Sequence, residues 1–291
     1  SYYHIGFSGD LGRKDGIILP PPDMPNESLD CLFTESTYGG EKHPSRDEEI
    51  LILKETINET IKNHGVILLP SFVLERAQEI IYLLSYLMQS KQIRPINIYL
   101  DSPMASKITE VFASYWHKGM FKDQFMLNFN AFSLDENPYL KIIESGEISA
   151  MLTKSREPHI VIAGAGMCDA GRIRNHLRAR LGFSNTTICI VGYMAENSLG
   201  RKLSERMPIV KMNGQEIMVR SKIVNFGSFS AHADGDFLVE YANASINKTS
   251  SLSKIVIVHG DEINGLKHKR DLVNSLGAVW EDKVLIPEEG E

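Results

Sequence analysis

Short apolar runs alternate with amphipathic stretches through the middle of the chain, and this alternation limits the possible fold more than any other feature. The run at 66–69 is apolar at every position, as expected for a parallel strand that is buried on both faces. Apolar residues also recur at helical spacing along 50–61, with charged residues on the opposite side. Strands that alternate with helices form a doubly wound parallel sheet. We therefore predict one α/β domain over residues 44–204, with strands at 66–69, 96–100, 160–163 and 187–191.

The last third of the chain returns to alternating strands. Asn213-Gly214 lies between two such strands and predicts a β-hairpin. Asp234 precedes apolar residues at helical spacing, so we expect it to be the N-cap of a helix.

The bulk properties narrow the class of protein. A length of 291 residues suits one large or two medium domains. No apolar run reaches the roughly 18 residues of a membrane span, and the first residues do not resemble a signal peptide. Cys31, Cys168 and Cys189 are odd in number and widely spaced, which favours a reducing cytoplasm. The net charge of −6 does not favour nucleic-acid binding, so a nucleic-acid enzyme would need a local basic groove or metal ions to receive phosphates.

Four residues with metal-binding or acid–base side chains each follow a predicted strand, in a turn that contains Gly or Ser: Asp10, Glu35, His232 and His259. Active sites of α/β folds are assembled from such strand ends, and two histidines with two carboxylates suit a zinc hydrolase. Plainer interpretations are an Asx-turn for Asp10, a capping or ion-paired Glu35 and a packed loop histidine for His232. The long sequence separations leave this choice open.

Nine segments resemble, in one order, the β-CASP branch of the metallo-β-lactamase superfamily, whose members include ribonuclease J and the cleavage-and-polyadenylation nuclease subunit. They are SGDLGR at 8–13, ESTYG at 35–39, PSF at 70–72 with RAQE at 76–79, DSPMA at 101–105, GMCDAGR at 166–172, VGYMA at 191–195, GR at 200–201, SAHAD at 230–234 and HGD at 259–261. The resemblance implies a metallo-β-lactamase αββα sandwich with an inserted doubly wound β-CASP domain. We accordingly expect residues 1–43 and 205–291 to form part of the metallo-β-lactamase domain and residues 44–204 to form the β-CASP domain.

The resemblance also implies roles for individual residues. Asp10 corresponds to the aspartate that bridges two zinc ions, and His259 to a late histidine ligand. Glu35 and His232 correspond to the pair beside the scissile phosphate, where the histidine protonates the leaving oxygen and the carboxylate orients it. The residues expected to contact the nucleic-acid backbone are Ser71, Ser102, Gly164, Ala165, Gly166 and Arg172. A Gly-rich turn that enters a helix also offers backbone N–H groups to phosphate, although tight strand–helix packing would equally require glycine there.

A predicted helix at 170–181 carries many basic residues. Arg172, His176 and Arg180 share one face, and Arg174 and Arg178 share another. Two interpretations remain open at this point: a solvated helix face, which is the commoner case, or a patch that tracks phosphates.

The sequence departs from the family pattern in two places. Ala165 stands where a serine is usual, which removes one hydroxyl contact to phosphate. The chain also contains no HxHxDH motif, which in the family holds most of the two-zinc cluster. We therefore expect an incomplete chain that alone binds zinc weakly, has little or no nuclease activity, and exposes apolar surface that favours a homodimer or a partner chain.

These observations predict a zinc-dependent phosphodiesterase of RNA processing, with RNA as the partner and two zinc ions in the intact protein. Exonuclease and endonuclease activity are not distinguished. A non-catalytic RNA-binding or scaffold subunit is the alternative, but it need not retain Asp10, Glu35, His232 and His259. A small-molecule hydrolase is a third possibility, and the large inserted domain disfavours it.

Overall fold

The computed structural model describes residues 2–26, 28–122, 125–247 and 252–288. The chain forms two compact units. The flanking unit comprises Ser1–Gly16, Pro20–His43 and Ala231–Glu291, and the inserted unit comprises Ile17–Leu19 and Pro44–Ser230. Each unit has its own sheet, so the two are described separately.

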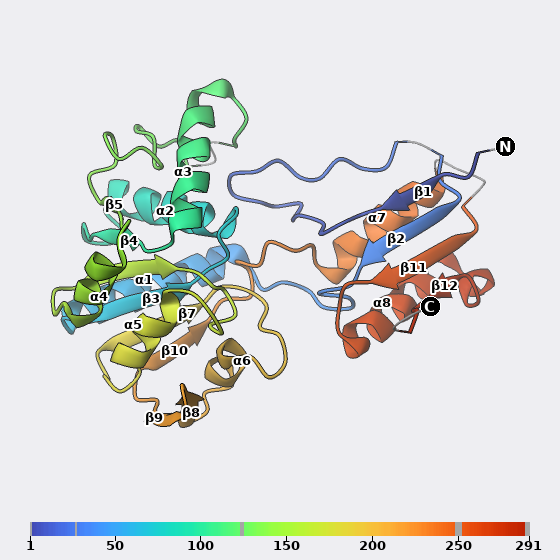
Figure 1. Ribbon diagram of the computed structural model, residues 1–291. Coiled ribbons are helices and arrows are strands. Elements are labelled where there is room, and N and C mark those ends of the chain that lie inside the picture. Colours follow the sequence, from blue (N-terminus) through green and yellow to red (C-terminus); the bar gives the residue numbers. More distant parts are fainter. Residues whose placement is uncertain (1, 27, 123–124, 248–251, 289–291) are drawn as a thin grey trace. The chain divides into compact units, whose positions relative to one another are not determined.

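The inserted unit is built on a six-stranded sheet in the order β10-β7-β3-β6-β4-β5, in which all neighbouring strands are parallel (Figure 1). The strands are β3 (Val66–Pro70), β4 (Ile98–Leu100), β5 (Leu140–Ile142), β6 (His159–Ala163), β7 (Thr186–Ile190) and β10 (Lys222–Asn225). The helices are α1 (Arg46–Lys62), α2 (Arg76–Gln89), α3 (Pro103–Tyr115), α4 (Gly146–Lys154), α5 (Ile173–Arg180) and α6 (Leu199–Ser204).

Helices cover both faces of this sheet. Alternate residues of β3 belong to different apolar cores: Ile67 and Leu69 pack with α1 and α2, whereas Leu68 packs with α5 and α6. Side chains of a strand point alternately to the two faces, so a strand buried on both must be apolar throughout. The doubly wound α/β fold predicted from the apolar runs is confirmed.

The inserted unit ends later than the predicted boundary at residue 204. Strand β10 pairs with β7 in parallel, which brings the chain up to Ser230 into this unit. The hairpin of β8 (Ile209–Met212) and β9 (Gln215–Met218) also belongs here, because Val210 and Met212 pack into the core beside α6. The hairpin itself forms around Asn213-Gly214 as the sequence predicted.

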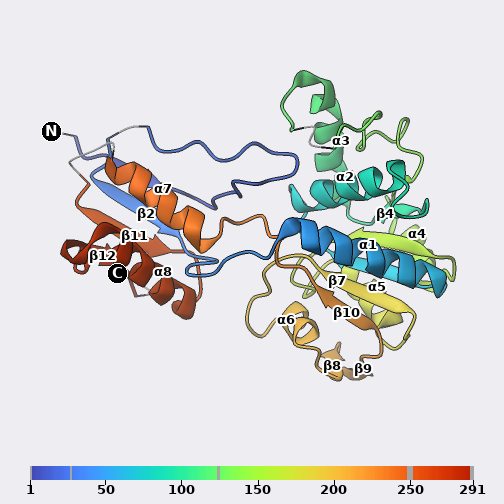
Figure 2. The ribbon, with the colours of Figure 1, turned by 180° about the vertical axis from the view of Figure 1, so that it is seen from behind.

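The flanking unit contains a four-stranded parallel sheet in the order β1-β2-β11-β12. Its elements are β1 (Ile5–Phe7), β2 (Cys31–Glu35), α7 (Gly235–Asn247), β11 (Lys254–Val258), α8 (Glu262–Leu276) and β12 (Val284–Leu285). Both helices pack on the same face of the sheet, where Leu32, Ile255 and Ile257 meet Ala242 and Leu272 (Figure 2).

The other face of this sheet carries exposed apolar side chains. Paired residues of parallel strands point to the same side, so Phe7 and Phe33 share that face, and their rings stack at 4.7 Å. Phe7 is 72% exposed, and Ile5 on the same strand and Leu285 on β12 are exposed too. A sheet with helices on one face fits one half of an αββα sandwich, and this α/β arrangement is that of a metallo-β-lactamase-like fold.

Two further findings concern membrane spans and cysteines. No helix in the described ranges is both long enough and apolar enough to cross a membrane. Cys31, Cys168 and Cys189 are buried and form no disulfide.

Candidate active site and metal centre

Three of the predicted site residues meet at one edge of the flanking sheet. Asp10 lies beyond the end of β1, and His259 directly follows β11. His232 is held beside them by a bridge between its backbone and Gly12. The metal-binding atoms of Asp10, His232 and His259 all lie within 4.8 Å of one another. Carboxyl ends of neighbouring parallel strands share one edge of a sheet, which explains why residues so distant in sequence meet.

A zinc ion fits this group by donor type and spacing. Carboxylate oxygen and imidazole nitrogen are both zinc ligands, and two ligands of one tetrahedral zinc lie ~3.3 Å apart. His259 Nε2 and Asp10 Oδ1 are 3.3 Å apart. The two side chains are 59% and 67% exposed, so an ion or a substrate can reach them.

Glu35, at the end of β2, lies behind His232. Its carboxylate is buried and accepts a hydrogen bond from His232 Nδ1, with distances of 3.0 Å to Oε2 and 3.2 Å to Oε1. The backbone N–H of Leu11 also donates to Glu35 Oε1. A carboxylate only accepts, so Nδ1 carries a proton and donates it to Glu35. Such a carboxylate–histidine pair fixes the ring orientation at metal and catalytic sites.

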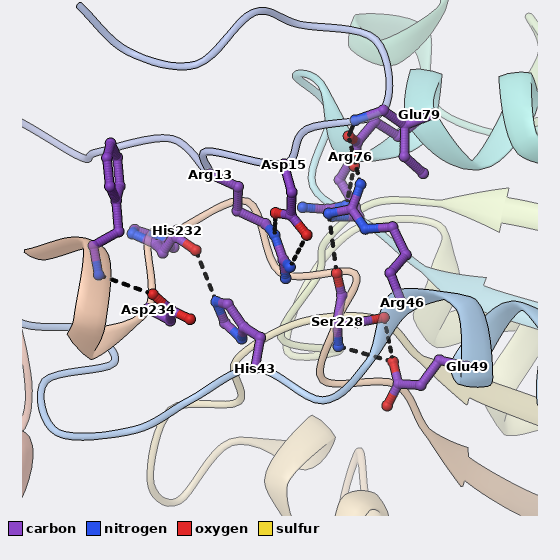
Figure 3. A network of polar contacts seen from close by, with 12 residues as sticks. Arg13, Asp15, His43, Arg46, Glu49, Arg76, Glu79, Ser228, His232 and Asp234 are labelled. Atoms are coloured by element: carbon purple, nitrogen blue, oxygen red, sulfur yellow. Dashed lines mark hydrogen bonds and ion pairs between the residues drawn. The ribbon is translucent and has the colours of Figure 1, made fainter. Parts of the chain in front are cut away.

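His43 holds the backbone of His232 and was not predicted from the sequence. Its Nε2 donates to the carbonyl oxygen of His232 at 2.9 Å (Figure 3). Burial, and then the charge of Arg13, lower the pKa of His43, which favours the neutral ring. Nothing in the local sequence pattern around His43 indicates this contact. Asp234 is the N-cap of α7, as predicted, since its Oδ1 accepts from Phe237 N at 3.0 Å.

His268 of α8 is a second histidine that the sequence did not single out. It is fully buried, and in the described part of the chain neither ring nitrogen has a hydrogen-bond partner. Helix α8 packs closely on the loop that follows Glu35: Asn264 Nδ2 donates to Thr37 O at 2.9 Å, and a Cβ on Gly39 would lie 2.6 Å from His268 Cβ. Burial lowers the pKa of His268 to about 4.

Because His268 is buried without a partner for its ring nitrogens in the described part of the chain, we expect the folded chain to lose stability in acid. Its pKa in the folded chain, about 4, lies below the ordinary 6.5, so between these values the unfolded chain binds the proton more tightly. The contribution of His268 to the free energy of unfolding is therefore complete above pH 6.5. Its protonation should lower this free energy by about 2–3 kcal/mol as the pH falls to 4. The measurement is urea unfolding followed by Trp280 fluorescence in a Trp116→Phe background.

His268→Leu should weaken this pH dependence, because leucine leaves no buried nitrogen to protonate. His159→Leu is the matched control, since His159 also has a pKa lowered to about 4 by burial but lies in the inserted unit. Equal pH dependence of the Trp280 transition in the parent and His268→Leu would contradict the prediction.

In the inserted unit, the predicted backbone-binding residues gather at the carboxyl ends of β3, β4 and β6. A Cβ on Gly164 would lie 3.6 Å from Ser102 Oγ and 3.9 Å from Ser71 O. Ser102 Oγ caps α3 by accepting from Ala105 N at 3.3 Å. The expected helix at 170–181 begins only at Ile173, so the turn at 164–167 does not enter it directly. Ile173 N donates to Gly164 O at 3.1 Å instead.

Arg172, His176 and Arg180 form neither of the surfaces that the sequence suggested for their face. Arg172 Nη1 donates to Asp101 Oδ1 at 2.8 Å and to Ile143 O at 2.9 Å. His176 is fully buried and its Nε2 lies 2.7 Å from Asp101 Oδ2, while Arg180 is buried and donates to Ser155 O. The face of Arg172, His176 and Arg180 is therefore an internal polar network, because Asp101, directly after β4, supplies the opposite charge. The face of Arg174 and Arg178 lies at the surface, where the two side chains donate to Asn213 Oδ1 and Gln215 Oε1.

A second polar network in the inserted unit joins segments that are distant in sequence (Figure 3). Glu79 pairs with Arg76 and Arg46 and accepts from Ile17 N at 3.0 Å. Glu49 accepts from the backbone and hydroxyl of Ser228. These buried carboxylates satisfy backbone groups where the chain enters and leaves the unit.

Comparison with known proteins identifies two domain families. Residues 77–203 match the Beta-Casp domain, and residues 216–286 match the Zn-dependent metallo-hydrolase RNA specificity domain.

The chain is 32% identical over 260 residues to a ribonuclease of Thermus thermophilus, and the match covers 88% of this chain and 57% of that protein. It is 31% identical over 266 residues to an RNase J-like protein of Methanocaldococcus jannaschii, covering 90% of this chain and 59% of that protein. An endoribonuclease of Schizosaccharomyces pombe, ysh1, is 29% identical over 90% of this chain and 33% of its own length. The chain thus spans less than two thirds of these relatives.

Proposed function

The chain belongs to the β-CASP branch of the metallo-β-lactamase superfamily, and on this premise we propose that it is part of a zinc-dependent phosphodiesterase that cleaves RNA. The observation that carries the proposal is the cluster of Asp10, His232 and His259 with Glu35 buried behind it. The names of the relatives, ribonuclease and endoribonuclease, support RNA as the substrate.

We assign Asp10 and His259 as zinc ligands. Both are exposed, and their donor atoms have the separation of two ligands of one ion. A bound zinc supplies Lewis-acid chemistry, which activates water and polarises a phosphoryl oxygen at neutral pH.

We assign His232 as the acid that gives a proton to the leaving oxygen of RNA, and Glu35 as the group that orients it. Glu35 receives Nδ1–H, so the proton for the leaving oxygen would be carried on Nε2. His43 supports the same ring through the backbone carbonyl of His232. In the inserted unit, Ser71, Ser102 and the turn of Gly164, Ala165 and Gly166 would contact the RNA backbone. Arg172 is left out of this set, since its guanidinium is bonded to Asp101.

Zinc binding by the isolated chain tests the ligand assignment. A catalytic zinc usually has three protein ligands, and the sequence contains no HxHxDH to hold a second ion. We expect at most one zinc per chain, held weakly, and a further loss of zinc in Asp10→Asn and His259→Gln. The measurement is zinc content after dialysis together with calorimetric titration.

Asp236→Asn is the control, because Asp236 is also exposed, follows His232 closely in the sequence and is outside the cluster. Two zinc ions that survive dialysis, or unchanged binding in Asp10→Asn, would refute the assignment.

A non-catalytic RNA-binding subunit is the second candidate, since residues 216–286 match an RNA specificity domain. The exposed sheet face around Phe7 suits either candidate as a surface for a partner chain or a second copy. RNA cleavage by the natural polypeptide that contains these 291 residues distinguishes the two candidates. Binding without zinc-dependent cleavage would support the subunit, and cleavage abolished by chelation would support the enzyme.

A further inference from the structure

Phe72 is an exposed aromatic residue that the proposed roles do not use. It follows Ser71 at the carboxyl end of β3, at the sheet edge where Ser102 and Gly164 also lie. The residue is 48% exposed, although aromatic rings on a stable fold are usually mostly covered. An exposed ring at this edge needs an explanation.

The ring rests on the turn at 164–167. A Cβ on Gly166 would lie 2.7 Å from both Cδ2 and Cε2 of Phe72 and 3.1 Å from Cζ. No side chain could therefore replace the glycine hydrogen without moving the ring. Gly166 is itself buried, so the turn supports one side of the ring while much of the residue still faces solvent.

Polar donors lie directly beside this ring. Cys168 N donates to Ala165 O at 3.0 Å and closes the turn, which places Gly166 and Met167 at its centre. Within the described ranges, no hydrogen bond uses the backbone N–H of Gly166 or Met167. An aromatic surface next to backbone donors matches a nucleotide, which presents a flat base and an anionic phosphate.

We propose that Phe72 is a stacking platform for one base of single-stranded RNA whose phosphates follow the edge formed by Ser71, Ser102 and Gly164. This inference rests on the proposed function, because it takes RNA as the ligand. Leu74, two residues after Phe72, and Met104, two residues after Ser102, are 62% and 63% exposed, but their side chains lack a π face. Because every base has a π face, we expect the platform to stack with any base and to add affinity without sequence preference.

Equilibrium binding to a fluorescently labelled RNA oligonucleotide, in EDTA to prevent cleavage, tests the proposal with the full 291-residue chain. Phe72→Ala should weaken binding about 5- to 100-fold, and Phe72→Trp should retain it. Leu74→Ala is the matched control, since it removes a neighbouring exposed apolar side chain without removing an aromatic ring. A second series uses an oligonucleotide of abasic ribose phosphates, for which Phe72→Ala and the parent should bind equally.

The outcomes distinguish a failure of the stacking platform from a failure of the proposed function. If the parent binds RNA but Phe72→Ala binds it equally well, the platform is wrong and the proposed function stands. If Phe72→Ala loses the same factor on abasic RNA, the ring only supports the turn, and the platform is again wrong. If Phe72→Trp binds as weakly as Phe72→Ala, stacking is excluded. If the parent binds no RNA, both the platform and the proposed function fail.

Discussion

Replacing Asp101 with alanine is expected to lower the free energy of unfolding of the inserted unit by about 3–5 kcal/mol. The Asp101 carboxylate is fully buried and accepts from Arg172 Nη1 at 2.8 Å, His176 Nε2 at 2.7 Å and Ser149 Oγ at 2.6 Å. Alanine would leave the buried His176 Nε2 and Ser149 Oγ without this acceptor, and Arg172 Nη1 with only the carbonyl of Ile143. Removing one partner from a buried, hydrogen-bonded pair costs more than the pair contributes.

The pKa of Asp101 supports the same expectation. Burial alone raises it, but hydrogen bonds from His176, Ser149 and Arg172 outweigh burial and hold the pKa below the ordinary 3.8. A carboxyl with a lowered folded pKa stabilises the chain above its unfolded pKa, and this stabilisation is lost as the pH falls below 3.8.

Urea unfolding at neutral pH, followed by Trp116 fluorescence in a Trp280→Phe background, measures the effect. Asp101→Asn should lose less than Asp101→Ala, because an amide oxygen still accepts one donor. Asp135→Ala is the control, since Asp135 is exposed in the same unit. A change below about 1 kcal/mol in Asp101→Ala would show that the network can reorganise at little cost.

The sheet of the inserted unit was predictable because its buried strands have a local signature. The run at 66–69 is apolar on both faces, and no tertiary information is needed to recognise it. Strand β10 lacks this signature: its four residues include Lys222 and Asn225, both exposed. Its place beside β7 is set by a pairing between residues that are far apart in the chain. The compact unit therefore continues to Ser230, beyond the boundary predicted at 204.

The candidate site was partly predictable, for a similar reason. Asp10, Glu35 and His259 follow strands whose ends must meet if the strands are parallel neighbours, so their approach follows from topology. The hydrogen bond of His43 and the burial of His268 depend on which loop and helix pack against them, and no local pattern encodes this. Helix α5 shows the same limit: its basic face appeared to be a surface because Asp101, the residue that neutralises it, lies more than 70 positions away.

Replacing His232 with alanine is expected to reduce RNA cleavage by about 10²- to 10⁴-fold in the natural polypeptide that contains this chain. His232 contacts the buried Glu35 and lies in the cluster with Asp10 and His259. Glu35→Gln should also lose activity, because an amide can present its N–H groups to Nδ1 and favour the wrong tautomer. The double variant should be little worse than His232→Ala, since Glu35 acts through the histidine.

Single-turnover cleavage and zinc content, measured on the same samples, separate the two roles open to His232. A proton donor lost to alanine should leave the zinc content unchanged, and added imidazole should restore part of the rate. If His232 is instead a zinc ligand, its replacement by alanine should lower the zinc content. Added zinc, and not added imidazole, should then restore activity. His4→Gln is the control, because His4 is exposed at the start of β1, away from the carboxyl ends of the strands. Full zinc content with no imidazole rescue would remove His232 from proton transfer and leave Glu35 as a purely structural carboxylate. Additive losses in the double variant would likewise break the link between the two residues on which the assigned mechanism depends.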